Sequence, residues 1–591
     1  NDGTILACHG DGAISSILVL ISRCQHTTPT LKVLSNQLSL KLNGISCLTR
    51  LDHHPREAMA ANHSPWLHQS YPTKDEEVTE TAEVHNNGHH ANIATTNEER
   101  DLKRGLSERH VAMLGIAGAI GTGLFLGLGS SVQKAGPAGA LLAYATVGLV
   151  VCAVQFALGE VAALMPVTGA FVRHAEFLVD PALGFAVGWN LVYGTTLSIP
   201  AEITAICVLF QYWTDLSPAV FIVIFMVLTV AVGFSLIRVF GEVEYIFGWL
   251  KILLVIFLII LGLVINLGGV PGTPRIGFKY WYSPGPWAEY IGTGHWGEFL
   301  GYWSVMTGAV FSFAGTESIA MAAAETRNPR KAIPRACKNV FIRVLVFYLL
   351  AILIVGMLVP SDDERLNNDG SDATASPFVI AASAAGIPAI PSVVNAIVIT
   401  SAWSASNQSL LSGTRVLYGL ALKGHAPRIF LRTTSWGVPY VCVSLYTAVM
   451  FLSFMSLSSG AITVFWWLVS LTSAGTLVSW STILFNHIRL RLALKKQNIP
   501  YTRLPWANRF TLHSSIAALG MCFIIILTSG FTVFTKGNWD PSSFVSSYFR
   551  DFPLVLAAFL FWKFYKKTRF LSLDEIDIEG ALREADEDKR Y

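Results

Sequence analysis

Blocks of about twenty apolar residues recur along the chain from residue 111 onward, and Asp, Glu, Lys and Arg are rare in each block. An α-helix needs about twenty residues to cross roughly 30 Å of hydrocarbon. The pattern therefore predicts an all-α polytopic membrane protein with about twelve transmembrane helices. Their expected limits are 111–131, 138–164, 183–211, 217–237, 243–268, 299–323, 339–360, 391–421, 438–457, 461–485, 513–533 and 552–565.

Both ends of the chain lack this pattern. Residues 1–105 are polar and rich in His and Asn, which predicts a disordered cytoplasmic tail. The first methionine is Met59, so we expect the biological start there and residues 1–58 to lie outside the native protein. Between the tails, residues 106–570 form the expected membrane domain. The acidic residues 571–591 predict a solvated cytoplasmic tail, where regulatory or ubiquitination machinery can act and Lys589 is a candidate modification site.

Composition agrees with a membrane protein and excludes several classes. Hydrophobic residues make up 52% of the chain and charged residues only 14%, whereas a soluble protein carries roughly 25% charged residues. The net charge of +3 is near balance and no basic stripe is interleaved with aromatic residues, so no nucleic-acid partner is expected. The eight cysteines show no metal-ligand spacing, so we expect neither a zinc site nor a disulfide framework.

Basic residues are concentrated in alternate connections between the spans. If the amino-terminal tail is cytoplasmic, the even-numbered connections are cytoplasmic too, and the acidic segment 361–372 lies outside. The positive-inside rule then places both termini in the cytoplasm. The basic residues of these connections are Arg327, Arg330, Lys331, Arg335, Lys338, Lys423, Arg428, Arg432, Arg489, Arg491, Lys495, Lys496, Arg503 and Arg509.

The first span contains the glycine-rich run GIAGAIGTGLFLGLG. One interpretation is close helix packing, which small residues at regular spacing allow. The other is a discontinuous helix, in which Gly121 and Gly123 flank Thr122 and free backbone groups at mid-membrane. The half-helix that starts there has a partial positive charge at its N-terminus, which suits a carboxylate.

The sixth span, TGAVFSFAGTESIAMAAAET, has a similar interruption. Gly315 can break this helix, Ser312 and Thr316 can satisfy the freed backbone groups, and Phe311 and Phe313 can cover a bound solute. The two interrupted spans are five helices apart, and an odd number of helices gives repeats of opposite orientation. The pattern therefore predicts two inverted five-helix repeats with a solute site between the broken helices.

Ionisable residues within the spans are the next candidates, because such residues are costly in hydrocarbon and usually face a polar interior. Glu202 lies near the middle of the third span and Lys251 about three turns into the fifth. For both, an ion pair that only fixes packing is the alternative. Glu317 follows the break in the sixth span and is a candidate hinge residue. We expect Glu244 to be interfacial and Glu160 to be an ordinary helix-end charge.

Four stretches carry a resemblance to a known family: LKRGLSERHVAMLGIAGAIGTGLFLGLG, ALGEVAALMPVTGAFVRHAEFLVDPALGFAVGWN, FSFAGTESIAMAAAETRNPRKAIPRA, and TSAWSASNQSLLSGTRVLYGLALKGHAPRIF followed by WGVPY. The run from about 101 to 570 resembles the fungal amino acid permeases, the yeast amino acid transporter family of the amino acid-polyamine-organocation superfamily. The resemblance implies a LeuT-type core of two inverted five-helix repeats plus two extra helices. It also implies uptake of amino acids across the plasma membrane, with the proton as coupling ion and no other cofactor.

The resemblance also assigns roles to particular positions. It puts substrate contacts on the backbone of Ile120, Gly121, Thr122 and Gly123 and on that of Phe311, Phe313 and Ala314, next to Ser312 and Gly315. Phe311 matches an aromatic gate. Lys251 matches a lysine that takes the place of a sodium ion in proton-coupled relatives, and Glu202 is the second candidate for proton coupling. The third span, GWNLVYGTTLSIPAEI, holds fewer aromatic residues than relatives do, so the resemblance leaves the pocket size and the substrate open.

Three alternatives belong to other classes. A major-facilitator carrier also has twelve spans, but its halves are parallel six-helix repeats and its G-x-x-x-D-R motif is absent here. A non-transporting amino acid sensor of the same fold is the stronger rival, because a fold does not determine a function. A membrane enzyme would need a catalytic motif, and no H-E-x-x-H, P-loop or nucleophile elbow stands in a suitable context.

Overall fold

The computed structural model describes residues 108–113, 121–167, 169–235, 237–321, 329–366, 377–387, 389–535, 539 and 552–587. The chain divides into two units, residues 1–87 and 88–591, and all described residues belong to the second. The amino-terminal tail, Ile120 and Lys589 therefore lie outside the described residues. Every regular element in the described ranges is a helix or a helical turn, in agreement with the all-α prediction.

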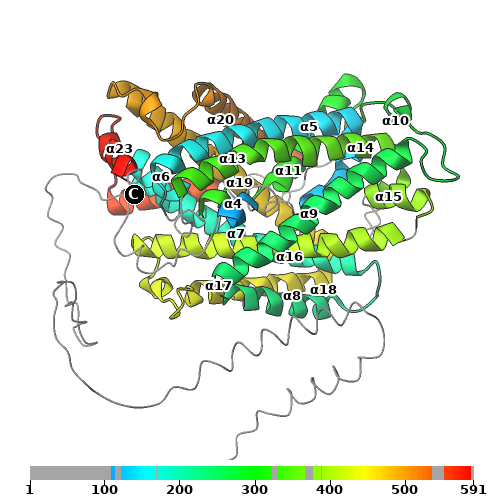
Figure 1. The fold of residues 1–591 in the computed structure, drawn as a ribbon, viewed down its shortest axis with the longest axis horizontal. Helices are drawn as coiled ribbons and strands as arrows, with labels where there is room; N and C mark the ends of the chain where they lie inside the picture. The colour runs from blue at the N-terminus through cyan, green and yellow to red at the C-terminus, as the bar shows by residue number, and fades with distance from the viewer. Residues whose placement is uncertain are drawn as a thin grey trace, which may run out of the picture. The chain divides into compact units, whose positions relative to one another are not determined.

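The helices of the described part are shown in Figure 1. Those from the first to the sixth expected span are α4 (Glu108–Met113), α5 (Thr122–Leu164), α6 (Phe171–Leu178), α7 (Pro181–Phe210), α8 (Pro218–Gly233), α9 (Ile237–Asn266), α10 (Lys279–Tyr282), α11 (Gly294–Phe313) and α12 (Ser318–Met321). Those that follow are α13 (Pro329–Arg343), the π-helix η3 (Val344–Leu349), α14 (Leu350–Leu358), α15 (Pro377–Ala384), α16 (Ala389–Leu422), α17 (Tyr440–Met450), α18 (Ser456–Ser459), α19 (Ala461–Lys496), α20 (Thr511–Thr528), α22 (Phe552–Lys566) and α23 (Ile578–Glu587). Short 3-10 turns occupy Glu364–Leu366, Arg428–Leu431, Phe451–Met455, Tyr501–Arg503 and Phe531–Phe534.

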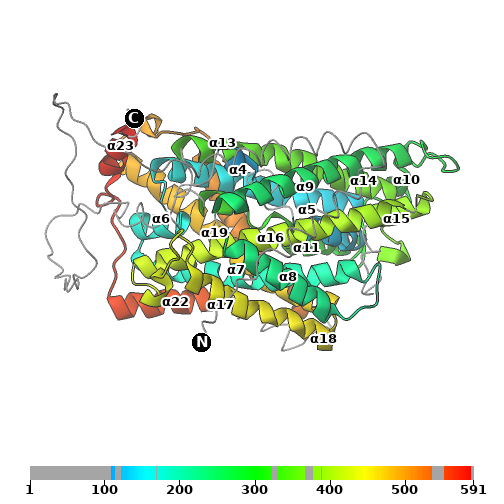
Figure 2. The ribbon, with the colours of Figure 1, turned by 60° about the horizontal axis from the view of Figure 1, so that its bottom comes forward.

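Eight helices of the described part are long and apolar enough to cross a membrane. They correspond to eight of the expected spans, the second, third, fifth and seventh to eleventh. The first expected span coincides with the start of α5. The fourth, sixth and twelfth coincide with α8, α11 and α22, which are shorter or less apolar than the eight long helices. The chain is therefore a multi-pass membrane protein. Within the bundle, α5 packs along α11, and α7 packs along both α16 and α19 (Figures 1 and 2).

The first and second expected spans meet at Gly136, inside α5. This glycine has φ +73° and ψ 172°, so the helix is broken there and continues from Pro137 in a new direction. A Cβ at position 136 would lie 2.7 Å from the carbonyl oxygen of Pro286, and the Ala138 N–H donates to that oxygen at 2.9 Å. The left-handed backbone and the close approach both require glycine.

Glu160, expected to be an ordinary helix-end charge, is fully buried at the end of α5. Its carboxylate lies 3.0 Å from His487 Nε2 and accepts a hydrogen bond from Arg491 Nη2 at 2.9 Å. His487 Nδ1 lies 2.9 Å from the Ser515 hydroxyl on α20. The prediction for Glu160 was wrong, because this network joins α5, α19 and α20, and a buried carboxylate needs such partners.

The carboxy-terminal tail, predicted to be solvated, instead packs on the end of the bundle. Gln497 Nε2 donates to the carbonyls of Leu573 and Ile576 at 2.8 and 2.9 Å. Arg503 forms two hydrogen bonds with Glu579, at 2.9 and 3.0 Å, and these bonds hold the pKa of Glu579 below its usual range. The apolar side chains of α23 lie in one buried cluster with the ends of α5 and α19; they are Ile578, Ala581, Leu582 and Ala585.

Burial of this apolar face predicts which change releases the tail. We expect Leu582→Asp to undock α23, because it places a charge in the apolar cluster and removes a buried leucine, at a cost of about 3 kcal/mol. Limited proteolysis of the membrane-embedded protein should then cleave the tail faster than in the wild type. Arg583→Asp is the control, because Arg583 is exposed. Equal cleavage of both variants would contradict the docking.

Candidate functional site

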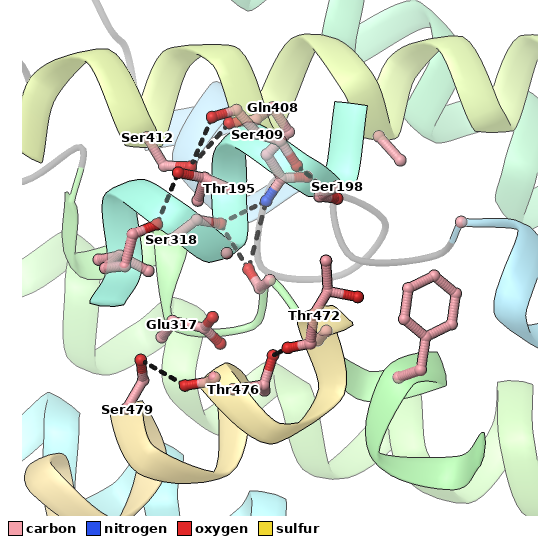
Figure 3. A pocket seen from close by; sticks show the side chains of 18 of the residues that line it. Thr195, Ser198, Glu317, Ser318, Gln408, Ser409, Ser412, Thr472, Thr476 and Ser479 are labelled. Atoms are coloured by element: carbon pink, nitrogen blue, oxygen red, sulfur yellow. Dashed lines mark hydrogen bonds between the residues drawn. The ribbon is translucent and has the colours of Figure 1, made fainter. Parts of the chain in front are cut away.

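One cavity lies inside the bundle, between α5, α7, α11, α12, α16 and α19 (Figure 3). The structure brings together at its wall eight residues singled out from the sequence: Gly121, Gly123, Glu202, Phe311, Ser312, Ala314, Gly315 and Glu317. Thr122, Phe313 and Lys251 are fully buried but do not line the cavity. The expected grouping of first- and sixth-span residues is therefore present in the structure.

The N-terminus of α5 opens into the cavity. Gly121 has an extended backbone, with φ −109° and ψ −154°, and the helix begins at Thr122. The first N–H groups of a helix have no partner within it and carry a partial positive charge. The half-helix that was predicted at Gly121–Gly123 is therefore present.

Neither glycine at this helix end has room for a side chain. A Cβ at Gly121 would lie 2.6 Å from Glu202 Oε1. A Cβ at Gly123 would lie 2.9 Å from Phe311 Cδ1 and 3.0 Å from Ser312 Cα. Close packing and helix interruption were alternatives in the sequence, and both hold here, since α5 starts at this point and also touches α11.

The sixth expected span is also interrupted at the cavity wall. Helix α11 ends at Phe313, Gly315 follows with φ +83°, and α12 begins at Ser318. The C-terminal turn of a helix presents carbonyl groups with a partial negative charge. The N-terminus of α5 and the C-terminus of α11 thus offer opposite partial charges within one cavity, an arrangement that suits a zwitterion.

Phe311 lies at the cavity wall, where its ring can cover a bound molecule. The ring is 8% exposed and meets the ring of Phe465 on α19 edge to face, with centroids 6.2 Å apart. Phe311 therefore links α11 to α19 across one side of the cavity.

Glu202 connects the cavity to buried charges behind it. The Thr122 hydroxyl donates to Glu202 Oε2 at 2.9 Å, so the carboxylate is held against the start of α5. Lys251 is fully buried and interacts electrostatically with Glu244 and Glu202. The interfacial position predicted for Glu244 was wrong: this residue is buried and accepts a 2.6 Å hydrogen bond from the Ser404 hydroxyl.

Glu317 lies on the other wall of the cavity, beside α19 (Figure 3). Trp480 Nε1 donates to its Oε2 at 3.3 Å, and the Thr316 hydroxyl lies 3.5 Å from the same atom. Both distances are long for hydrogen bonds to a carboxylate. Backbone N–H groups of the turn after α11 contribute as well, so Glu317 ties this turn to Trp480 on α19 at the break in the sixth span, where the sequence predicted a hinge.

Sequence reasoning missed most of the polar side chains that line the cavity. They come from α7, α16 and α19 and are Asn190, Thr195, Ser198, Gln408, Ser409, Ser412, Thr472, Thr476 and Ser479. Most of them lie three or four residues from another member within an apolar helix, which was a usable signal, because residues at this spacing share one face. Among the described residues, no group of three or more His, Cys, Asp or Glu side chains could hold a metal ion.

Comparisons with known proteins place the chain in a family. The family described as "Amino acid permease" matches residues 110–575. The dicarboxylic amino acid permease of Saccharomyces cerevisiae is 34% identical over 83% of this chain and 84% of its own length. The proline-specific permease of Emericella nidulans is 37% identical over 83% of this chain and 90% of its own.

A solved structure is also similar. The manganese transporter of Eremococcus coleocola matches with a TM-score of 0.49 and 12% identity, over 81% of this chain and 95% of its own. The family and the relatives are named as permeases, which carry solutes and are not enzymes. The resemblance noted in the sequence is thus confirmed, and the chain belongs to the amino acid permease family.

Proposed function

We propose that this amino acid transporter takes up its substrate across the plasma membrane in symport with protons, with both termini in the cytoplasm. The observation that carries the proposal is the cavity between two oppositely polarised helix ends. The N–H groups at Gly121–Gly123 suit the α-carboxylate, and the end of α11 at Phe311–Ala314 suits the α-ammonium group. A zwitterionic backbone is common to amino acids, so this part of the site is independent of the side chain carried.

The buried charges behind Glu202 support the coupling to protons. Lys251 interacts electrostatically with Glu202 and Glu244, and Glu202 accepts the hydrogen bond from Thr122 at the start of α5. Protonated Lys251 would favour the state in which Glu202 holds the start of α5 in place. Loss of that proton toward the cytoplasm would release the contact and, with it, the substrate. Proton and substrate would then favour the same state, and such linkage acts in both directions.

Uptake of radiolabelled amino acids by permease-deficient fungal cells that express the chain tests this proposal. We expect accumulation against a gradient, greater at acidic than at neutral external pH and abolished by a protonophore. A protein that binds amino acids without accumulating any of them would be a sensor and would overturn the proposal. Accumulation that is unaffected by external pH and by the protonophore would support amino acid transport and exclude the coupling to protons.

We also expect Phe311→Ala to weaken transport, because the ring covers the substrate and excludes water. The apparent KM should rise by about tenfold, equivalent to about 1.4 kcal/mol of binding, or uptake should become uncoupled from the proton gradient. Phe234→Ala is the control, because Phe234 ends α8 and does not line the cavity. Equal effects in both variants, measured by initial uptake rates at several substrate concentrations, would indicate general destabilisation instead of gating.

A further inference from the structure

Two of the side chains that line the cavity have buried amide oxygens that lack a partner in the described part of the chain. They are Asn190 Oδ1 on α7 and Gln408 Oε1 on α16. Both side chains are more than nine-tenths buried. A buried acceptor without a hydrogen bond is costly, and few native side chains are left in this condition. Since Asn190 and Gln408 line the cavity, a bound molecule with hydrogen-bond donors can supply these partners.

The NH₂ groups of the same two side chains are engaged, so the oxygens are the groups left without a partner. Asn190 Nδ2 donates to the Gly475 carbonyl on α19 at 3.0 Å. Gln408 Nε2 donates to the Ser318 hydroxyl and lies 3.4 Å from the Gly315 carbonyl. Reversal of the Asn190 amide would place its oxygen against the Gly475 carbonyl, so this acceptor is held in place. The Ser318 hydroxyl can donate as well as accept, so Gln408 can present either end of its amide.

The charged side chains at the cavity wall also favour a substrate side chain that donates hydrogen bonds. Two carboxylates, Glu202 and Glu317, line the cavity, and no Lys or Arg does so among the described residues. A substrate side chain with a negative charge would thus meet acceptors and carboxylates without a cationic partner. An aliphatic side chain would leave the two amide oxygens unpaired.

We infer that the side-chain part of the site takes amino acids whose side chains donate hydrogen bonds and carry no negative charge, with Asn190 and Gln408 as the residues that select them. This inference rests on the proposed function and adds the class of substrate. Asparagine, glutamine, serine, threonine, lysine and arginine have such side chains. A site with acceptors that need a donor discriminates strongly against an analogue that lacks one.

Competition for uptake tests the inference in the full-length wild-type protein. Unlabelled glutamine, lysine, leucine and glutamate compete with labelled glutamine at a range of concentrations. We expect glutamine or lysine to compete at least about tenfold better than leucine or glutamate. The comparison of glutamine with lysine shows whether neutral or cationic donors are preferred. If leucine or glutamate competes as well as glutamine and lysine do, the inference is overturned, whereas the proposal of amino acid transport stands.

Two variants test the assigned residues separately. Asn190→Leu and Gln408→Met keep side-chain size and remove the acceptor, so each should lower the preference for glutamine over leucine by about tenfold. Asn266→Leu is the matched control: Asn266 Nδ2 also donates to a backbone carbonyl and its Oδ1 also lacks a partner among the described residues, but it lies outside the cavity. An unchanged preference in every cavity variant that folds would overturn the assignment, even if only one of the two can be measured.

A second readout separates this inference from the proposed function. Thermal unfolding of the purified wild-type protein is followed with each of the four amino acids, because a ligand that binds the folded state raises the unfolding temperature. We expect stabilisation by glutamine or lysine and not by leucine or glutamate. If cells accumulate no amino acid, the proposed function fails. The binding measurement then still shows whether the site prefers amino acids with donor side chains.

Discussion

Gly123→Val should reduce uptake by up to about a hundredfold without preventing insertion into the membrane. A Cβ at this position would lie 2.9 Å from Phe311 Cδ1 and 3.0 Å from Ser312 Cα and Oγ, so two further methyl groups cannot be accommodated between α5 and α11. Overpacking of this kind costs about 1–3 kcal/mol, and each 1.4 kcal/mol is a factor of ten in binding. The added side chain would displace the N–H groups at the start of α5 from the α-carboxylate.

Gly315→Val should have a similar effect for a different reason. Gly315 has φ +83°, which a β-branched residue adopts only with strain. The turn between α11 and α12 would shift, and the carbonyls at the end of α11 would move away from the α-ammonium group.

Two glycines on the same helices provide matched controls. A Cβ at Gly127 would meet only Tyr144 Oη, at 3.9 Å, and a Cβ at Gly308 would meet nothing within 4 Å. Initial uptake rates, normalised to the amount of protein at the cell surface, should therefore be near wild type for Gly127→Val and Gly308→Val. Normal transport by Gly123→Val or Gly315→Val, or equal loss in the controls, would contradict the site.

The breaks in the first and sixth spans could be predicted from the sequence because their causes are local. Glycines on both sides of Thr122, and Gly315 between an aromatic run and a polar one, weaken a helix whatever surrounds it. The spans themselves were predictable for the same reason, since length and apolar composition are properties of a single segment.

What the sequence did not reveal depends on contacts between distant segments. Glu160 meets His487 across 327 residues and Glu244 meets Ser404 across 160. No local pattern shows that these carboxylates are partnered instead of lying at a membrane face. The hydroxyl-rich wall was missed because its faces become one surface only when α7, α16 and α19 pack together.

Lys251→Met should abolish accumulation against a gradient and remove the pH dependence of uptake, with slow exchange as the remaining activity. Lys251 is fully buried and interacts electrostatically with Glu244 and Glu202, and methionine keeps most of its volume while removing the charge. Loss of one partner from a buried ion pair is also destabilising, by about 3–5 kcal/mol. The amount of protein at the cell surface must therefore be measured together with uptake.

A double variant separates coupling from stability. Lys251→Met combined with Glu244→Gln restores the charge balance, so we expect the surface amount to recover while accumulation remains absent. Lys279→Met is the control for loss of a lysine, since Lys279 is exposed on α10. Full, acid-stimulated accumulation by Lys251→Met would show that this lysine is structural.

Glu202→Gln then identifies which group carries the proton. The amide keeps the size of the side chain and can still accept the hydrogen bond from Thr122, so the start of α5 should stay in place. If the proton resides on Lys251, this variant should change substrate affinity or range and still respond to external pH. If it resides on Glu202, the variant should lose accumulation and pH dependence as completely as Lys251→Met. Measurement of pH-dependent uptake in the two variants therefore distinguishes the two proton sites. Each site predicts a different result for Glu202→Gln.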